Sequence, residues 1–452
     1  MTKQQRLVLI VSIVATFLSG LDASVVNVAL PAIVRDLGGG LPVQQWVNSS
    51  YAITLGSLIL VAGSLSDIFG RKRILMIGVI GFGLTSAMCA LAPSALFLIL
   101  SRGLQGVFGA LLVPSSLALI IAYFSGAAQT KAVGTWTGWG SIAFLVGPLV
   151  GGTLIDTFSW RFIFLINIIP AIIVLLLMRG LKTEKQRPES KVDMIGAVLC
   201  TIGLGAIVTG FIEQPVLGWQ HPLILGCLVG GLIVLGLFLW LESHIEKPML
   251  PLSLFKVRNF SAGNLATLSI YAGLAVSTFL LTIFLQQVGH YTALNAGLSI
   301  LPITFIMFFL SPRFGALAGR FGPRLFMTAG PLIAALGFSL FLRVDASANY
   351  LVQVLPGIIV FGLGLSMTVA PLTAAVLSDI DKDHAGIGSA VNNAVARIAG
   401  LLAISSVGVI IGVSLNVESF HTGIIAMVFL LTLGGITSLV GIRNHPHHQT
   451  SK

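Results

Sequence analysis

Charged residues and cysteines are both scarce in this chain. Asp, Glu, Lys and Arg make up 9% of its 452 residues, whereas an ordinary soluble domain has about 25%. That shortage excludes a water-exposed globular protein of this length. The three cysteines, Cys89, Cys200 and Cys227, lie in apolar segments and have neither the spacing of a metal site nor that of a disulfide framework. No Walker sequence is present, so we expect no metal ion, nucleotide or other cofactor.

Long apolar stretches dominate what remains. Apolar residues account for 56% of the chain, and a helix needs about 20 of them in succession to cross a membrane. Several apolar stretches are separated by fewer than ten residues, which leaves no room for a soluble domain between them. We therefore predict an all-α polytopic membrane protein. The fourteen predicted spans are 7–33, 46–65, 74–93, 95–123, 133–153, 161–181, 194–213, 222–241, 261–285, 297–312, 325–342, 350–377, 385–413 and 421–442.

The basic charge of the chain follows the predicted topology. The formal net charge is +10, which by itself is also typical of proteins that bind nucleic acids. If the N-terminus is cytoplasmic, however, 20 of the 25 Lys and Arg residues fall in cytoplasmic loops and tails, and three fall in outer loops. This is the positive-inside bias of membrane proteins. We therefore expect both termini in the cytoplasm, contact with anionic lipids and no nucleic-acid partner.

One short loop sequence occurs twice. The segment 63–73, GSLSDIFGRKR, lies between two predicted spans, and a degenerate copy at 315–325, GALAGRFGPRL, follows 252 residues later. A loop repeated between apolar runs indicates a duplicated helix bundle, and such bundles usually transport a solute. The repeat predicts an N-terminal bundle over 1–181, a linker with two additional spans over 182–260, and a C-terminal bundle with a short tail over 261–452.

The first copy of this loop contains the pattern G-x-L-x-D-x-x-G-R-K, which resembles the loop signature of the major facilitator superfamily. Five stretches resemble motifs of its fourteen-span drug:proton antiporter subfamily, namely 21–31, 102–109, 147–152, 160–170 and 388–397. The resemblance implies a major facilitator fold of two six-helix bundles plus two extra central helices. It also implies proton-coupled export of lipophilic, cationic or neutral compounds across the plasma membrane by alternating access, without enzymatic activity. The expected partners are a small-molecule substrate, protons and membrane lipids, and the expected state is a monomer.

Asp22 is the one acid placed well inside a predicted span. A charge at that depth is costly, so the carboxylate must face a cavity, find a partner or take up a proton. Burial and a neighbouring cation act in opposite directions on its proton affinity, and the resemblance favours proton coupling over a fixed structural acid. Arg102 is the expected partner, either directly or through Gln105 or water. The alternative for Arg102 is a structural role on helix carbonyls.

The repeated loop supplies a predicted cytoplasmic gate. By resemblance, Asp67, Gly70 and Arg71 clamp the two halves together, with the acid facing the start of the helix near 385–388. A carboxylate near a helix N-terminus gains roughly 0.3–1 kcal/mol. Ile68 stands where the family often has Arg, so part of the charge relay is missing. The alternative is a loop that only anchors the topology.

A proline and three glycines mark the span 133–153. Pro148 removes a backbone hydrogen bond and is expected to bend this helix. Gly147, Gly151 and Gly152 let neighbouring helices approach closely, and packing alone also explains them. Their link to export comes only from the resemblance.

A substrate cavity is expected to be lined by aromatic, Met and polar side chains. The candidates are Asn27, Trp46, Tyr51, Trp136, Trp139, Phe279, Phe284, Gln287, Met367, Asn392, Asn393 and Arg397. The last three either line the cavity or fasten their helix to its neighbours. Two other functions stay open: a carrier of an anionic metabolite or lipid that uses Arg102 and Arg397, and a non-transporting membrane sensor.

Overall fold

The chain is helical throughout the part that the computed structural model describes. The described residues are 1–181, 193–245, 248–378, 380 and 385–444, without the side chains of Leu60, Asp67, Ala127, Thr130, Ser141, Ala385 and Gly386. The long helices are α1 (Lys3–Leu37), α2 (Gly40–Phe69), α3 (Arg71–Ala90), α4 (Ala95–Tyr123), α5 (Gly126–Thr157), α8 (Met194–Leu217), α9 (Pro222–Glu242), α10 (Arg258–Gln287), α11 (Ala293–Phe321), α12 (Pro323–Ser339), α13 (Leu355–Leu377), α14 (Ala385–Ser405) and α16 (Val417–Gly441). The shorter elements are α6 (Phe162–Leu165), α7 (Ile168–Met178), α15 (Val407–Ile411), the 3-10 helices η1 (Leu252–Lys256) and η2 (Leu340–Arg343), and the π-helix η3 (Tyr350–Val354).

Twelve helices in these residues are long and apolar enough to cross a membrane. They match twelve of the predicted spans, so a multi-pass membrane protein is confirmed. The other two predicted spans correspond to α2, which has Gln44, Gln45 and Asn48 in its first turns, and to the shorter apolar segment Phe162–Met178, which is divided into α6 and α7. The predicted count of fourteen spans is therefore not confirmed.

Several helices extend beyond their predicted ends. The predicted span 297–312 is part of the 29-residue helix α11, which continues through both Pro302 and Pro312. Proline is tolerated in membrane helices because neighbouring groups satisfy the freed backbone atoms. Likewise, α8 does not end at Glu213 but continues to Leu217.

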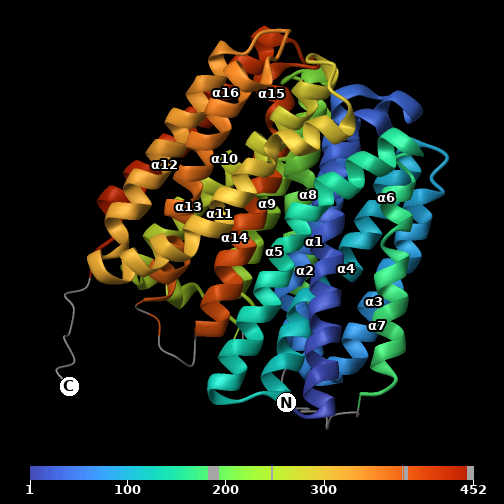
Figure 1. The fold of residues 1–452 in the computed structure, drawn as a ribbon, viewed down its shortest axis with the longest axis vertical. Coiled ribbons are helices and arrows are strands. Elements are labelled where there is room, and N and C mark those ends of the chain that lie inside the picture. The colour runs from blue at the N-terminus through green and yellow to red at the C-terminus, as the bar shows by residue number, and fades with distance from the viewer. Residues whose placement is uncertain (182–192, 246–247, 379, 381–384, 445–452) are drawn as a thin grey trace. The chain divides into compact units, whose positions relative to one another are not determined.

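Two compact units make up the chain, and unit 1 contains the predicted proton site. Unit 1 comprises Met1–Met249, Phe279–Leu298 and Ile404–Asn416. Within it, α1 packs against α5 and α4, α2 packs against α4, and α8 packs against α9 and α2 (Figure 1). A buried apolar core between α1, α3, α4 and α7 includes Val11 and Phe82. This core fixes the helices that surround Asp22.

Unit 2 comprises Leu250–Thr278, Ser299–Ala403 and Val417–Lys452. Here α12 packs against both α13 and α16. A separate core contains Phe260 of α10 and Met327 of α12, both with no exposed surface. Each unit therefore has its own buried core.

The repeated loop has the same backbone form in both copies. Gly70 alone separates α2 from α3 and has a φ angle of 94°. In the second copy, Gly322 alone separates α11 from α12 and has a φ angle of 86°. Both angles lie in a region that L side chains rarely adopt, which explains a glycine at each position. The sequence repeat thus corresponds to a repeated tight connection between helices.

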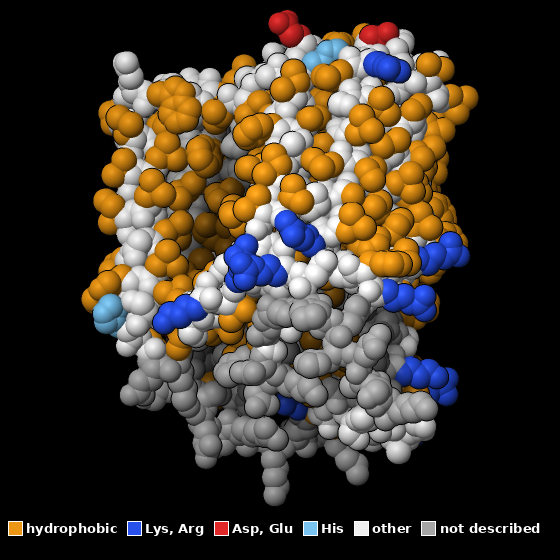
Figure 2. Space-filling view, turned by 90° about the vertical axis from the view of Figure 1, so that its left-hand side faces the viewer, with side chains coloured by type: hydrophobic (Ala, Val, Ile, Leu, Met, Phe, Trp, Pro, Cys, Tyr) orange, Lys and Arg blue, Asp and Glu red, His pale blue; other side chains and the backbone are white. Residues whose placement is uncertain are grey.

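The described surface is apolar over long stretches of helix. Figure 2 shows hydrophobic side chains over most of the described surface of one face, with most of the visible Lys and Arg side chains gathered below them. Large side chains such as Leu232 and Ile233 on α9 and Phe429 on α16 are about two thirds exposed, at 64%, 65% and 66%. A continuous surface of this kind suits lipid hydrocarbon rather than water.

Candidate functional site: a buried ion pair on α1 and α4

A buried ion pair joins α1 to α4. Nη1 of Arg102 donates to Oδ2 of Asp22 at 2.7 Å, and the exposed fractions of the two side chains are 1% and 0%. The sequence left a direct pair and an indirect link through Gln105 or water open. The structure contains the direct pair.

Gln105 closes a ring on this pair. Its Oε1 accepts from Nη1 of Arg102 at 2.6 Å, and its Nε2 donates to Oδ1 of Asp22 at 3.0 Å. The same Nε2 donates to Oγ of Ser86 at 2.8 Å. Arg102 and Gln105 are three residues apart on α4, so they share one face of the helix. The direct contact and the predicted link through Gln105 therefore occur together.

Asn167 is a further donor to Asp22, and the sequence analysis gave it no role. Its Nδ2 donates to Oδ1 of Asp22 at 2.8 Å and lies 3.4 Å from Oγ of Ser86. Asp22 thus accepts hydrogen bonds from Arg102, Gln105 and Asn167. The available signal was a single Asn in an otherwise apolar stretch, 162–178.

The Arg102 guanidinium is enclosed by aromatic rings as well as by polar groups. Its Cζ lies 4.2 Å from the centre of the Tyr51 ring and 5.8 Å from that of Phe164. Its Nε donates to the carbonyl of Val47 at 3.2 Å. Cation–π contacts stabilise a guanidinium most when it is desolvated. Tyr51, a predicted cavity residue, therefore packs against the buried ion pair.

The glycines of α5 allow α1 to approach closely. A Cβ atom at Gly147 would lie 1.7 Å from Oγ of Ser24, and one at Gly151 would lie 3.1 Å from Cβ of Val25. The Ser24 hydroxyl donates across this contact to the carbonyl of Ala143 at 3.2 Å. Any side chain at Gly147 would separate the two helices. This contact holds the segment of α1 that carries Asp22.

Gly152 and Pro148 face the first turns of α11, which belong to unit 1. A Cβ atom at Gly152 would lie 2.5 Å from Cα of Leu294, and one at Gly297 would lie 2.7 Å from the Pro148 carbonyl oxygen. The helix α5 continues across Pro148 from Gly126 to Thr157. Close packing therefore accounts for these residues, and the bend at Pro148 stays a prediction.

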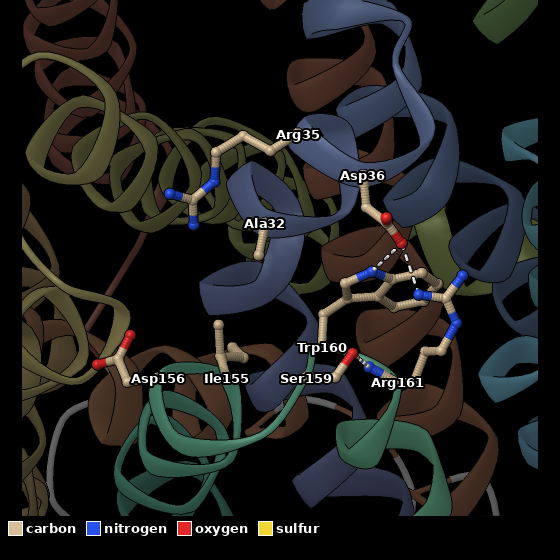
Figure 3. A pocket seen from close by; sticks show the side chains of 8 residues that line it. All are labelled: Ala32, Arg35, Asp36, Ile155, Asp156, Ser159, Trp160 and Arg161. Atoms are coloured by element: carbon tan, nitrogen blue, oxygen red, sulfur yellow. Dashed lines mark hydrogen bonds and ion pairs between the residues drawn. The ribbon is translucent and has the colours of Figure 1, made fainter.

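An open pocket of about 410 Å³ lies where α1 and α5 end (Figure 3). On one side of it, Asp36 accepts from Nη1 of Arg161 at 2.5 Å and from Nε1 of Trp160 at 2.9 Å. On another side, the Asp156 carboxylate accepts from the backbone N–H groups of Ala293 and Leu294 at 3.1 and 2.9 Å. Asp156 thereby caps α11 from a neighbouring helix, an arrangement that a helix N-terminus favours. None of the predicted cavity residues lines this pocket.

Comparison with known proteins decides the family. The sequence model of the Major Facilitator Superfamily matches residues 12–404. The chain belongs to the major facilitator superfamily. It is similar to "Multidrug resistance protein Stp" of Mycobacterium tuberculosis (strain CDC 1551 / Oshkosh), with 32% identity over 92% of this chain and 78% of that relative. It is also similar to "Puromycin resistance protein pur8" of Streptomyces alboniger, with 34% identity over 88% of this chain and 80% of that relative.

A solved structure of a transporter shares the fold. The crystal structure of the peptide transporter POT in complex with sulfate aligns with a TM-score of 0.73 at 14% identity, over 97% of this chain and 94% of that one. At that identity, the likeness concerns the fold alone. Membership in the superfamily makes the chain a membrane transporter and not an enzyme.

The other predicted cavity residues of this superfamily member that lie in unit 1 differ in their hydrogen bonds and their exposure. Asn27 accepts from Asn48 at 3.0 Å, and Nε1 of Trp46 donates to Glu213 on α8 at 2.8 Å. Nε1 of Trp136 donates to Oγ of Ser116 at 3.2 Å. Trp139 is 48% exposed and Gln287 is also exposed, whereas Phe279 and Phe284 are fully buried.

The predicted cavity residues in unit 2 are three polar residues of α14 and one Met of α13. Nδ2 of Asn392 donates to Asn264 at 3.1 Å and to Thr267 at 2.8 Å, which fastens α14 to α10. Asn393 is exposed and accepts from Nε of Arg397 at 3.0 Å. Met367 is half-buried. The predicted cavity draws on residues of both units and stays a prediction.

The predicted gate is only partly visible. Gly70 ends α2, and the half-buried Arg71 begins α3. The next residue, Lys72, donates from Nζ to the carbonyl of Leu181 at 2.5 Å. The Asp67 side chain lies outside the described residues, so its predicted capping role stays a prediction.

Proposed function

We propose that this superfamily member is a proton-coupled exporter of lipophilic, cationic or neutral compounds. The observation that carries the proposal is the buried carboxylate of Asp22, which lies in an apolar helix and is held by one cation and two amides. A charge buried at membrane depth is a functional feature by default. The names of its relatives Stp and pur8 refer to multidrug and puromycin resistance, which supports export of drug-like compounds.

The chemistry of the site supports an exchange between a proton and the ion pair. While Asp22 is ionised, it offsets the charge of Arg102. Protonation of Asp22 leaves the guanidinium buried without its counter-ion, which costs about 3–5 kcal/mol. The protonated site therefore favours a different arrangement of α1 and α4. In this way a proton gradient selects between the two states of an alternating-access cycle.

The rest of the cycle is proposed from the architecture of the family. Fourteen spans, with α2 and Phe162–Met178 completing the twelve clear ones, give two six-helix bundles, two extra central helices and cytoplasmic termini. The bundles rock around a central cavity, and Asp67 with Arg71 closes its cytoplasmic side. The protein acts as a monomer in the plasma membrane, among lipids, and the proton gradient is its energy source.

The substitution Asp22→Asn tests this proposal in everted membrane vesicles. Asn keeps the shape and most hydrogen bonds of the site but cannot exchange a proton. We expect the variant in the membrane with gradient-driven efflux of a cationic dye lost. Asp36→Asn is the matched control, because Asp36 is an acid of the same helix in an exposed ion pair, and it should retain efflux. Full gradient-driven efflux by Asp22→Asn would remove Asp22 from the mechanism.

The alternative of an anion carrier has less support. It requires Arg102 and Arg397 as ligands, yet Arg102 is buried and engaged by Asp22. A comparison of cationic and anionic dyes in the same vesicles separates the two functions. Selective transport of the anion would favour the carrier.

A further inference from the structure

Asn167 lies where the segment Phe162–Met178 is divided into α6 and α7, but its side chain does not cap α7. It occupies the N-cap position of α7, and its side chain makes no capping hydrogen bond. Asn is one of the preferred residues for such bonds. Here the side chain points instead to Asp22 and Ser86, at 2.8 and 3.4 Å, with no exposed surface. Its amide is therefore committed to the Asp22 site.

The two ends of this amide have different surroundings. Nδ2 donates to the carboxylate, whereas Oδ1 is buried and has no hydrogen-bond partner among the described residues. A buried acceptor without a partner is costly. Rotation of the amide by half a turn exchanges donor and acceptor, because the two ends of Asn have the same shape. A protonated Asp22 can then donate its O–H to Oδ1.

We infer that Asn167 is a positioning residue that sets the pH at which Asp22 exchanges its proton. The inference rests on the proposed proton-coupled function and extends it to a group on the break between α6 and α7. With the amide in one orientation, Asn167 stabilises the ionised carboxylate, and in the other it accepts from the protonated form. The charge-assisted bond to the ionised form is roughly twice as strong as the neutral one. Asn167 therefore does not stabilise the two protonation states of Asp22 equally.

The other groups around Asp22 are accounted for. Arg102 from α4 is the one charged partner that contacts the carboxylate among the described residues. From α3, Cys89 contacts Gln105, and from α2, Tyr51 lies on the guanidinium. Neither group donates to Asp22 in the described hydrogen bonds. A change at Asn167 therefore alters one direct contact of the carboxylate and leaves its charged neighbour in place.

The test measures the Asp22 proton directly and separately from transport. The protein with its full chain is placed in lipid nanodiscs, and its infrared carboxyl band is titrated with pH. The Asp22 band is the one absent from Asp22→Asn. In Asn167→Leu, which keeps the branched shape but removes both amide ends, we expect the midpoint of this band to move. The pH profile of dye efflux should move in the same direction.

A matched control is a buried Asn of unit 2, Asn259, which hydrogen-bonds to Ser378 and to the backbone of Arg443. Asn259→Leu should leave the Asp22 midpoint unchanged. If Asn167→Leu does not accumulate, Asn167→Ala carries the same test with a smaller side chain.

The outcomes separate this inference from the proposed function. An unchanged Asp22 midpoint in both variants overturns the role of Asn167, whatever happens to efflux. A shifted midpoint with an unchanged efflux profile supports that role and contradicts proton coupling through Asp22. Parallel shifts of both support the inference together with the proposed function.

Discussion

Unit 1 buries a charged pair between α1 and α4, whereas the corresponding helices of the repeat in unit 2 have no such charge. From Asn259 to Gln287 in α10, and throughout Leu355–Leu377 in α13, the sequence contains no Asp, Glu, Lys or Arg. The described contact between α10 and α14 is made of amides and a hydroxyl, Asn392 with Asn264 and Thr267. The corresponding helices of the two units therefore make different polar contacts: an ion pair in unit 1, and amide and hydroxyl groups in unit 2.

This difference indicates what the fold requires. In its described residues, unit 2 packs around apolar residues and a small amide network, and no buried ion pair occurs among them. A buried ion pair is weak evidence for stability, since its desolvation offsets most of its attraction. The charge at Asp22 is therefore better explained by function than by folding.

The largest effect is expected from a substitution that removes one residue of the Asp22–Arg102 pair. Arg102→Met leaves the Asp22 carboxylate buried without its cation, which costs about 3–5 kcal/mol. We expect a much lower unfolding temperature for the purified variant in detergent. The double variant Asp22→Asn/Arg102→Met removes both charges and should recover most of that stability, but not gradient-driven efflux. No recovery in the double variant would show that the two side chains are not one energetic unit.

The second largest effect is expected from glycine substitutions, which compare the two copies of the repeated loop. Gly70→Ala and Gly322→Ala both place a side chain at a φ angle near 90°, which costs about 1–3 kcal/mol. At Gly322 the new Cβ would also lie 2.2 Å from Cγ of Asn444, whereas nothing lies within 4 Å of it at Gly70. Gly322→Ala should therefore lower the unfolding temperature more. Adding Asn444→Ala should reduce the Gly322→Ala loss to the Gly70→Ala level; a persistent difference would contradict the proposed clash.

A smaller effect is expected from the amide network of unit 2. Asn264→Leu removes the acceptor of one Asn392 bond and the donor to the Phe260 carbonyl. Hydrogen bonds between membrane helices contribute about 1 kcal/mol, so a modest loss of thermal stability should follow. A loss as large as that of Arg102→Met would contradict the distinction between the units.

The smallest effect concerns an exposed acid of unit 2. Hydrogen bonds from Ser347 and Gln353 hold the pKa of the Asp345 carboxyl below its usual value. Because the pKa is lower in the folded protein, its contribution is present above the unfolded pKa and is lost as pH falls through the folded pKa. Asp345→Asn should therefore have a slightly lower unfolding temperature than the parent protein, by the same amount throughout pH 5 to 8, because that range lies above the unfolded and the folded pKa. A pH-dependent difference in that range would contradict this assignment.

Many residues of the Asp22 site could be predicted from the sequence, but not all of them. Asp22 and Arg102 stood out because a charge in an apolar span needs a partner, and Gln105 followed from its position on the same helix face. Asn167 and Ser86 did not stand out, because an amide or hydroxyl in a membrane helix is common and its target depends on which neighbour it faces. The cap that Asp156 provides to α11 depends likewise on a contact between residues far apart in the chain.

The helical class, the membrane setting and the repeat can be read from the amino-acid sequence. They follow from local properties: the length of apolar runs, the placement of Lys and Arg, and a loop that occurs twice. The rotation of each helix about its axis is known from the folded structure alone, and with it the contacts of Gly147 with Ser24 and of Asn167 with Asp22. In a membrane helix the lipid side and the core side are both apolar, so the pattern of hydrophobic residues does not encode that rotation.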